Sequence, residues 1–182
     1  YTSSVVRTLG DKLGERPSLR DFSAVGDGAT DDTTAIAAAL SAVAARGGGE
    51  LLVDSGTYKI TAALTIPTGV TLTGYGAKSV FTPVGTLSTG TGWFDITGTG
   101  ARLDNFTFEG GTTTACGVFY DTYGTPDFND QPLDPLLTGN SSIWLHPGAH
   151  NAKIQRVTIT HTGGYAILID AVDGDIRNVR IL

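Results

Sequence analysis

The sequence feature that most constrains the fold is an apolar pattern that occurs three times in the second half of the chain. Its copies are Leu103, Phe106 and Phe108, then Ile154, Val157 and Ile159, and then Ile176, Val179 and Ile181. The second copy follows the first by 51 residues, and the third follows the second by 22. A 22-residue period is typical of one turn of a β-solenoid, and 51 residues suit two turns with an inserted loop.

Alternate residues of each solenoid strand point into a shared core, so equivalent positions stack on one another. The repeat therefore predicts inward columns made of Phe106 and Phe108, Val157 and Ile159, and Val179 and Ile181. Short apolar runs broken by glycine precede it, at 64–66, 70–72 and 93–96. With 25 glycines and only 16% charged residues, the composition favours many short strands and tight turns over a helical bundle.

The stretch 21–60 predicts a strand, a helix and two further strands. Residues 22–25 are a short apolar run that we interpret as the first strand. Gly26, Asp27 and Gly28 then form a turn, because Gly adopts positive φ cheaply and Asp hydrogen-bonds its own backbone. Asp31 or Asp32 follows as the N-cap of the helix.

The predicted helix runs from about Asp32 to Arg46, with one apolar face formed by Ile36, Leu40 and Val43. A glycine run ends it, and strands at 51–53 and 57–60 follow. On local physics alone, the helix is either a lid on one end of an elongated β structure or part of an ordinary βαβ unit.

Residues 21–33 read Asp-Phe-Ser-Ala-Val-Gly-Asp-Gly-Ala-Thr-Asp-Asp-Thr. This stretch resembles the opening signature of the pectate-lyase-like right-handed β-helix superfamily, although Ser23 stands where the family usually has Gly. The glycine run at 47–49, the strand at 51–53 and the Gly-Thr-Tyr at 56–58 match its continuation. The resemblance implies an all-β fold, a right-handed parallel β-helix (solenoid) with an N-terminal capping α-helix. The superfamily includes pectate lyases, polygalacturonases, glucanases, epimerases and viral tailspikes, so the resemblance does not select one enzyme.

Residues 1–20 are predicted to be a neck or leader segment, with the first coils of the β-helix in residues 21–182. Val6, Leu9 and Leu13 have helical spacing, and Pro17 ends the segment. Two glycines weaken such a helix, so it either needs a partner surface or is a frayed leader. The segment resembles the neck of phage tailspike and tail-fibre proteins, which implies a homotrimer with residues 1–20 about the three-fold axis.

The net charge of −6 argues against nucleic acid as a partner, because nucleic acid needs a basic face. An acidic polysaccharide would need a local basic patch or bound cations. Cys116 is the one cysteine, so no intrachain disulfide can form. The sequence has no run of about 18 apolar residues, so we predict no transmembrane span and no membrane partner.

The chain offers many carboxylates but no spacing that selects a catalytic pair, which glycoside hydrolysis typically requires. The candidates are Asp95, Asp104, Glu109, Asp121, Asp127, Asp130, Asp134, Asp170, Asp173 and Asp175. Asp173 and Asp175 lie in a sequence typical of a turn. The catalytic residues are therefore unknown, and the resemblance implies that they lie on later coils or between subunits.

His146, His150 and His161 do not form a metal-ligand pattern, and we predict neither a metal site nor a cofactor. Residues 120–140 are rich in Pro and Asp and read as an inserted loop. This loop is the rim of a sugar groove, a subunit contact or decoration. Trp144 and Tyr120 have rings that could stack on sugars, and with Asp121 they are the predicted substrate-binding residues. Packing in the core or in a loop is the alternative for Trp144.

The chain stops in the middle of a predicted coil, so we expect the β-helix to be incomplete at its C-terminus. The resemblance implies the N-terminal part of a tailspike-like protein that binds and depolymerises bacterial surface polysaccharide. Its place would be the virion tail or outside the cell, with virion tail proteins as further partners. The alternatives are a secreted polysaccharide lyase or glycoside hydrolase and a non-catalytic virion structural or adhesion module, so enzymatic activity stays open.

Overall fold

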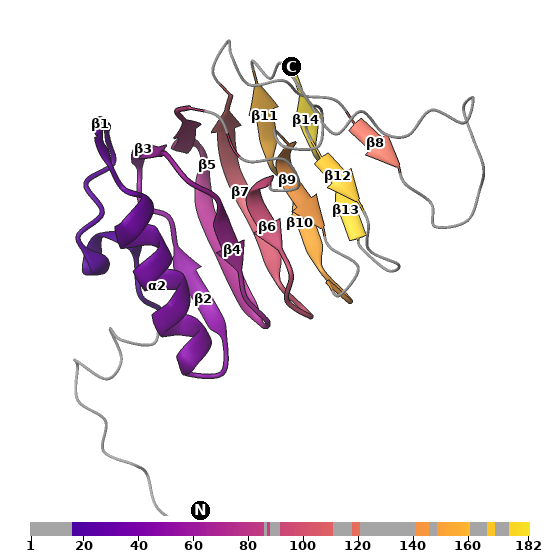
Figure 1. Cartoon of the computed structure of the whole chain (residues 1–182), viewed down its shortest axis with the longest axis horizontal. Coiled ribbons are helices and arrows are strands. Elements are labelled where there is room, and N and C mark those ends of the chain that lie inside the picture. The colour runs from indigo at the N-terminus through magenta and orange to yellow at the C-terminus, as the bar shows by residue number, and fades with distance from the viewer. Residues whose placement is uncertain are drawn as a thin grey trace, which may run out of the picture.

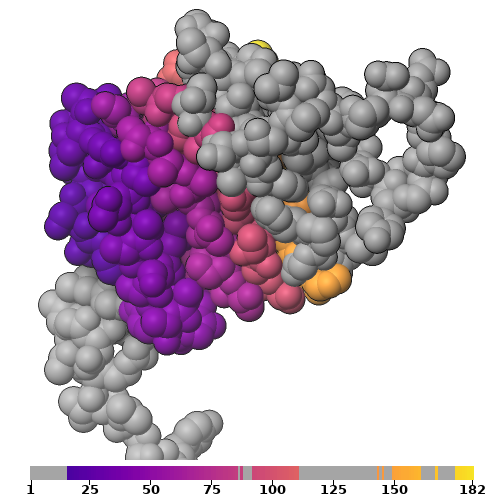
Figure 2. Space-filling model, in the orientation of Figure 1, coloured from indigo at the N-terminus to yellow at the C-terminus, as the bar shows by residue number. Residues whose placement is uncertain are grey.

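The computed structural model describes residues 16–85, 87, 92–110, 118–120, 141–145, 149–160, 167–169 and 175–182. These residues form a stack of coils whose neighbouring strands all pair in parallel (Figure 1). The colours follow one another along the longest axis from the N-terminal end to the C-terminal end (Figure 2). The predicted parallel β-helix is therefore the architecture of the chain.

The strands form two sheets, and successive coils add strands to both. Sheet A contains β1 (Asp27–Asp31), β2 (Gly49–Leu52), β3 (Gly56–Ile60), β5 (Val70–Pro83), β7 (Arg102–Glu109), β10 (Lys153–Gln155), β11 (Thr158–Thr160), β13 (Asp175–Arg177) and β14 (Arg180–Ile181). Sheet B contains β4 (Leu64–Ile66), β6 (Gly92–Ile96), β9 (Ser141–Leu145), β12 (Ile167–Ile169) and β8 (Val118–Tyr120). The long strands β5 and β7 each span two shorter strands, so sheet A runs continuously along the stack.

The strand register confirms the apolar repeat residue by residue. Leu103 pairs with Ile154, which pairs with Ile176 on the next strand. Phe108 pairs with Ile159 in the same way. The first two copies of the pattern are fully buried, whereas Ile181 on the edge strand β14 is 48% exposed.

The interpretation of the 51-residue spacing as two turns of the solenoid is wrong. Strands β7 and β10 are direct neighbours in sheet A, so the chain from Leu103 to Ile154 makes one coil. β9 supplies the sheet B strand of that coil, between β6 and β12. The extra strand β8 instead pairs with the far edge of β12, out of sequence order.

Each copy of the repeat contains one residue in the left-handed conformation, within β7 in the first copy and between two short strands in the others. Asn105, Arg156 and Asn178 have φ angles of 57°, 54° and 53°. They occupy equivalent positions, and Asn tolerates this conformation better than most residues. The same bend therefore recurs on successive coils and keeps their strands in register.

A cluster of aromatic rings fills the interior between the two sheets. The Phe81 ring centroid lies 5.0 Å from that of Phe94 and 5.2 Å from that of Phe106, both in edge-to-face geometry. Tyr58 and Phe108 extend the cluster at centroid distances of 5.8 Å and 5.7 Å from Phe81 and Phe94. All five residues are fully buried, so these aromatics link consecutive coils.

The predicted helix is present as α2 (Thr33–Ala45), one residue shorter at each end than expected. Ile36, Leu40 and Val43 are buried in the core, and α2 contacts β2 and β4 at the N-terminal end of the stack (Figure 1). Its last turn ends in left-handed glycines, with the Gly48 N–H donating to the Val43 carbonyl at 3.1 Å. Its role as a cap of the solenoid stays a prediction.

The strand predicted at residues 22–25 is wrong. Leu19–Phe22 form a short 3-10 helix, η1, which begins with a reciprocal capping box between Ser18 and Asp21. The backbone N–H of Ser18 donates to the Asp21 carboxylate at 2.7 Å, and such capping favours a helical turn over an extended strand. The first strand is β1, which starts at Asp27 and pairs with β3.

The turn chemistry predicted at Gly26–Gly28 is confirmed, although two of its residues lie in β1. Gly26 and Gly28 have φ angles of 68° and 76°. The Asp27 carboxylate accepts hydrogen bonds from the backbone N–H groups of Ala29 and Thr30 at 2.8 Å and 2.7 Å.

Both predicted capping carboxylates are used, but in different ways. Asp31 accepts from the Thr33 backbone N–H at 3.0 Å, in the first turn of α2. Asp32 stands at the N-cap position but points back, accepting from the backbone N–H groups of Val25 and Gly26 at 2.7 Å and 3.1 Å. Asp32 thus joins the start of the helix to the segment between η1 and β1.

We expect Asp31 to make the stability of the chain depend on pH. Hydrogen bonds from the hydroxyls of Thr33 and Thr61, and from the Thr33 N–H, lower the pKa of Asp31 below its ordinary value of 3.8. A depressed folded-state pKa stabilises the fold above the unfolded pKa, and this stabilisation is lost as pH falls through the folded pKa. Chemical denaturation midpoints at about pH 6 and about pH 3 should therefore differ less for Asp31→Asn than for the parent chain. An identical difference in both proteins would show that this carboxylate has no such role.

The described part of the predicted neck lies against the β-helix. Leu19 is fully buried, and the Leu52 N–H donates to the Pro17 carbonyl at 2.8 Å. Residues 1–15 lie outside the described residues, as does the trimer contact predicted for them. Among the described residues, no helix has the length and apolarity needed to span a membrane.

Candidate functional site

The outer face of sheet A carries charged side chains on neighbouring strands. On β7, Leu103 points into the core while Arg102 and Asp104 alternate with it, and on β10 Lys153 and Gln155 alternate with buried Ile154. We define the outer face by these positions and their register partners, which are Thr71, Thr73, Arg102, Asp104, Lys153, Gln155, Asp175 and Arg177.

The register arranges this face in two rows that cross the strands. The first row runs from Glu50 through Thr71, Arg102 and Lys153 to Asp175. It therefore has a carboxylate at each end and two adjacent cations between them. Because neighbouring strands lie about 4.8 Å apart, each step along the row advances by one coil of the solenoid.

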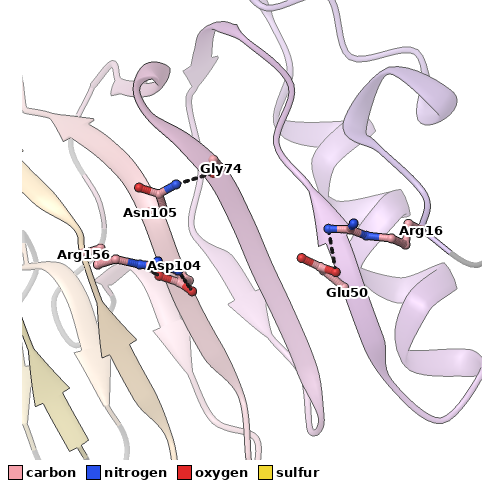
Figure 3. Close-up of polar contacts among 6 residues, drawn as sticks. All are labelled: Arg16, Glu50, Gly74, Asp104, Asn105 and Arg156. Atoms are coloured by element: carbon pink, nitrogen blue, oxygen red, sulfur yellow. Dashed lines mark hydrogen bonds and ion pairs between the residues drawn. The ribbon is translucent and has the colours of Figure 1, made fainter.

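Arg156 and Asp104 form a bidentate ion pair on this face (Figure 3). The guanidinium Nε and Nη2 donate to the two carboxylate oxygens at 2.8 Å and 2.5 Å. The left-handed backbone at Arg156 directs this side chain back over β7, and Asp104 is left only 7% exposed. The hydrogen bonds from the Arg156 guanidinium to Asp104, and the negative charge of that carboxylate, raise the pKa of Arg156.

Two further ion pairs involve the carboxylates at the two ends of the first row. Arg16 contacts Glu50 at 2.9 Å (Figure 3), and Arg177 contacts Asp175 at 2.7 Å. Among the described residues, the side chains of Arg102 and Lys153 take part in no ion pair. The carboxylates nearest to them are thus each engaged with another cation.

The positive charge of the second half of the chain is concentrated in sheet A. Every Lys or Arg that follows Lys78 in the sequence lies in its strands or in the bends between them: Arg102, Lys153, Arg156, Arg177 and Arg180. The chain as a whole carries a net charge of −6. Because Arg156 and Arg177 are paired with Asp104 and Asp175, the positive charge left on the face is that of Arg102 and Lys153.

That Arg102 and Lys153 lie opposite each other on adjacent strands was not predicted from the sequence, although the repeat contains the signal. Arg102 precedes Leu103, Lys153 precedes Ile154 and Asp175 precedes Ile176, so the three charged residues share one position of the pattern. Applying the 51- and 22-residue offsets to polar positions would have placed them side by side.

Tyr75 is the one exposed aromatic residue among those whose side chains the structure describes, at 52%. It lies in an irregular part of β5 where the register with β7 shifts. Its backbone N–H donates to the buried Ser79 hydroxyl at 2.9 Å, and the Asn105 amide donates to the Gly74 carbonyl at 2.9 Å (Figure 3). These bonds fix the backbone on which the ring is presented, so Tyr75 can serve as a stacking surface for a sugar.

The predicted substrate-binding residues are placed only in part. Trp144 lies in β9 and pairs with Leu168 of β12. Tyr120 ends β8 and pairs with Ile169, one position further along β12. The two residues therefore occupy different register rows of sheet B, while Asp121 lies outside the described residues.

The candidate carboxylates do not meet as a pair in the described structure. Asp95 is on β6 of sheet B, where it accepts from the Gly92 N–H at 2.7 Å, whereas Asp104 is on β7 of sheet A. Glu109 is at the other end of β7 from Asp104, and Asp175 is on β13 of sheet A. The other candidates lie outside the described residues: Asp121, Asp127, Asp130, Asp134, Asp170 and Asp173.

The predictions for the histidines are only partly covered by the structure. His150 is exposed in a turn, with its carbonyl accepting from the Gly100 N–H at 2.7 Å. His146 and His161 lie outside the described residues. Within the described part of the chain, no three His, Cys, Asp or Glu side chains are grouped as metal ligands.

The stacked parallel coils with a charged outer face define the class of this protein as a parallel β-helix. Residues 18–100 match the family described as rhamnogalacturonase A/epimerase, pectate lyase-like. The AlgE4 A-module of Azotobacter vinelandii superposes with a TM-score of 0.64 at 22% identity, over 89% of this chain and 43% of that one. The chain thus has the pectate-lyase-like right-handed parallel β-helix fold, and the resemblance found in its sequence is confirmed.

The chain is similar in sequence to curated proteins of two kinds, an epimerase and a phage tail spike. The chain is 42% identical over 170 residues to the mannuronan C5-epimerase AlgE3 of Azotobacter vinelandii, covering 81% of this chain and 8% of that protein. It is 40% identical over 81 residues to the tail spike protein of Shigella phage Sf6, covering 42% of this chain and 13% of that protein. The chain spans between 8% and 17% of the length of the curated relatives that it matches.

Proposed function

We propose that this chain is the N-terminal part of a tailspike-like protein that binds a bacterial surface polysaccharide, which the full-length assembly depolymerises. The observation that carries the proposal is the double similarity of the β-helix, to a polysaccharide epimerase over 81% of the chain and to a phage tail spike over 42%.

The outer face of sheet A supports a role in binding an extended polymer. It is a continuous surface along the coils, with Thr71, Thr73 and Gln155 as neutral hydrogen-bonding groups between the charged residues. The exposed ring of Tyr75 adds a surface on which a sugar can stack. A polysaccharide lying along the stack would meet a neutral side chain at Thr71, cations at Arg102 and Lys153, and a carboxylate at Asp175.

The alternative is a secreted polysaccharide-modifying enzyme, which the 42% identity to an epimerase over 170 residues favours. Of the candidate carboxylates, Asp95 lies in sheet B and Asp104 in sheet A, and the residues that would carry out the chemistry of either candidate stay unassigned. A tailspike-like protein would assemble as a homotrimer in a virion tail, and light scattering of the full-length protein would give three times the mass of one chain.

The experiment is a binding and depolymerisation assay on the full-length protein with purified surface polysaccharides of bacterial hosts. We expect binding together with a fall in the size of the polymer, measured by size-exclusion chromatography. Binding without size reduction or epimerisation would identify a non-catalytic adhesion module, and no binding to any polysaccharide would contradict the proposal.

Trp144→Ala tests the proposed sugar contact of Trp144, Tyr120 and Asp121, because it should weaken binding while leaving the melting temperature nearly unchanged.

A further inference from the structure

Arg102 and Lys153 are like charges placed directly opposite each other on adjacent strands. Their Cα positions are register partners in the parallel pairing of β7 with β10. Like charges in this arrangement destabilise a sheet, unless an anion lies between or above them. The described residues supply no ion pair to either side chain.

The nearby carboxylates do not neutralise this pair. Asp104, two residues along β7 from Arg102, is held by the bidentate contact with Arg156 at 2.8 Å and 2.5 Å. Asp175 is the register partner of Lys153 on β13, but it bonds Arg177 at 2.7 Å. Two adjacent cations thus remain available to an external anion in a chain whose net charge is −6.

We propose that Arg102 and Lys153 form a subsite for the acidic groups of an anionic polysaccharide. The inference rests on the proposed function and adds the chemical class of the polymer. A carboxylate or sulfate placed over the pair would remove the repulsion and gain charge-assisted hydrogen bonds from both side chains. Because guanidinium forms bidentate pairs with such groups and ammonium acts as a point charge, Arg102 would orient the anion and Lys153 would add to its attraction.

The geometry of the sheet suits a polymer rather than a single anion. The two cations lie about 4.8 Å apart along the solenoid axis, which is close to the advance of one pyranose unit in an extended polysaccharide. Thr71 lies on one side of the pair in the same row, and Gln155 lies beside Lys153 on β10. These neutral side chains can bond sugar hydroxyls next to the acidic group.

Lys153→Glu separates this role from a structural one. The substitution places a carboxylate opposite Arg102, which turns that repulsion into an attraction, and also opposite Asp175, whose charge is paired with Arg177. Since these two effects oppose each other, we expect the thermal midpoint of the variant to stay close to that of the parent chain. Its affinity for an acidic polysaccharide should fall about tenfold or more, since a charge-assisted contact is lost and a repulsive charge is gained.

The control is Lys78→Glu, which makes the same change in net charge at an exposed position outside the face. The probes are mannuronan as the acidic polymer, dextran as a neutral one and a DNA duplex, with binding to the chain measured by isothermal titration calorimetry at low and high salt. We expect salt-sensitive binding of mannuronan by the parent and by Lys78→Glu, little binding of dextran, and weak binding of DNA.

Unchanged affinity of Lys153→Glu for mannuronan would overturn the inference, as would equal affinity of the parent for DNA and mannuronan. If the parent binds a neutral bacterial polysaccharide but not mannuronan, the acidic subsite fails while the proposed function stands. If the parent binds no polysaccharide of either kind, both fail together.

Discussion

Phe81→Ala should reduce the free energy of unfolding by about 3–5 kcal/mol, the range found when a buried aromatic ring is truncated. Phe81 is fully buried, and its ring contacts Tyr58, Phe94 and Phe106 at centroid distances of 5.8, 5.0 and 5.2 Å. These partners belong to both sheets and to neighbouring coils. Truncation would therefore open a cavity where several coils meet, and chemical denaturation followed by circular dichroism would measure the loss.

Two variants control this prediction. Phe81→Leu retains most of the volume and should cost less than Phe81→Ala. Val84→Ala removes an apolar side chain that is 46% exposed just after β5, and should change stability by no more than about 0.5 kcal/mol. If Phe81→Ala were as mild as Val84→Ala, the aromatic cluster would not be the core that links the coils.

Gly98→Ala should destabilise the chain by about 3 kcal/mol, at the upper end of the usual cost of overpacking. A Cβ at Gly98 would lie 2.0 Å from the Thr68 backbone nitrogen and 2.3 Å from the Pro67 carbonyl carbon. The neighbouring turn cannot easily move away, because the Gly69 N–H donates to the Thr99 carbonyl at 2.9 Å. Relief of the clash would therefore break the hydrogen bonding between turns of adjacent coils.

Gly100→Ala is the matched control in the same turn. Gly100 has a φ of 69°, but a methyl group added to its Cα would meet no atom within 4 Å, so the substitution adds only backbone strain. That strain costs about 1–2 kcal/mol. The unfolding midpoint of Gly98→Ala should lie clearly below that of Gly100→Ala, and equal midpoints would mean that the close approach of the turns is not required.

The sequence by itself determined the repeat unit and the elements with strong local signals. The 51- and 22-residue offsets between the copies of the apolar pattern match the residue pairing of β7 with β10 and of β10 with β13. They match because stacking of buried side chains fixes equivalent positions on successive strands. The helix at Thr33–Ala45 and its glycine stop were also predictable, since both depend on residues close in sequence.

Only the tertiary structure decided how the coils are counted and where the charged groups meet. The placement of β8 beyond β12 depends on pairing between segments far apart in the chain, which no local pattern encodes. The strand predicted at 22–25 did not form, because a capping contact and packing of Leu19 hold Phe22 in η1, and Asp32 holds the backbone of Val25. Arg102 and Lys153 became neighbours for the same non-local reason: 51 residues of chain separate them, and the parallel pairing of β7 with β10 places them side by side.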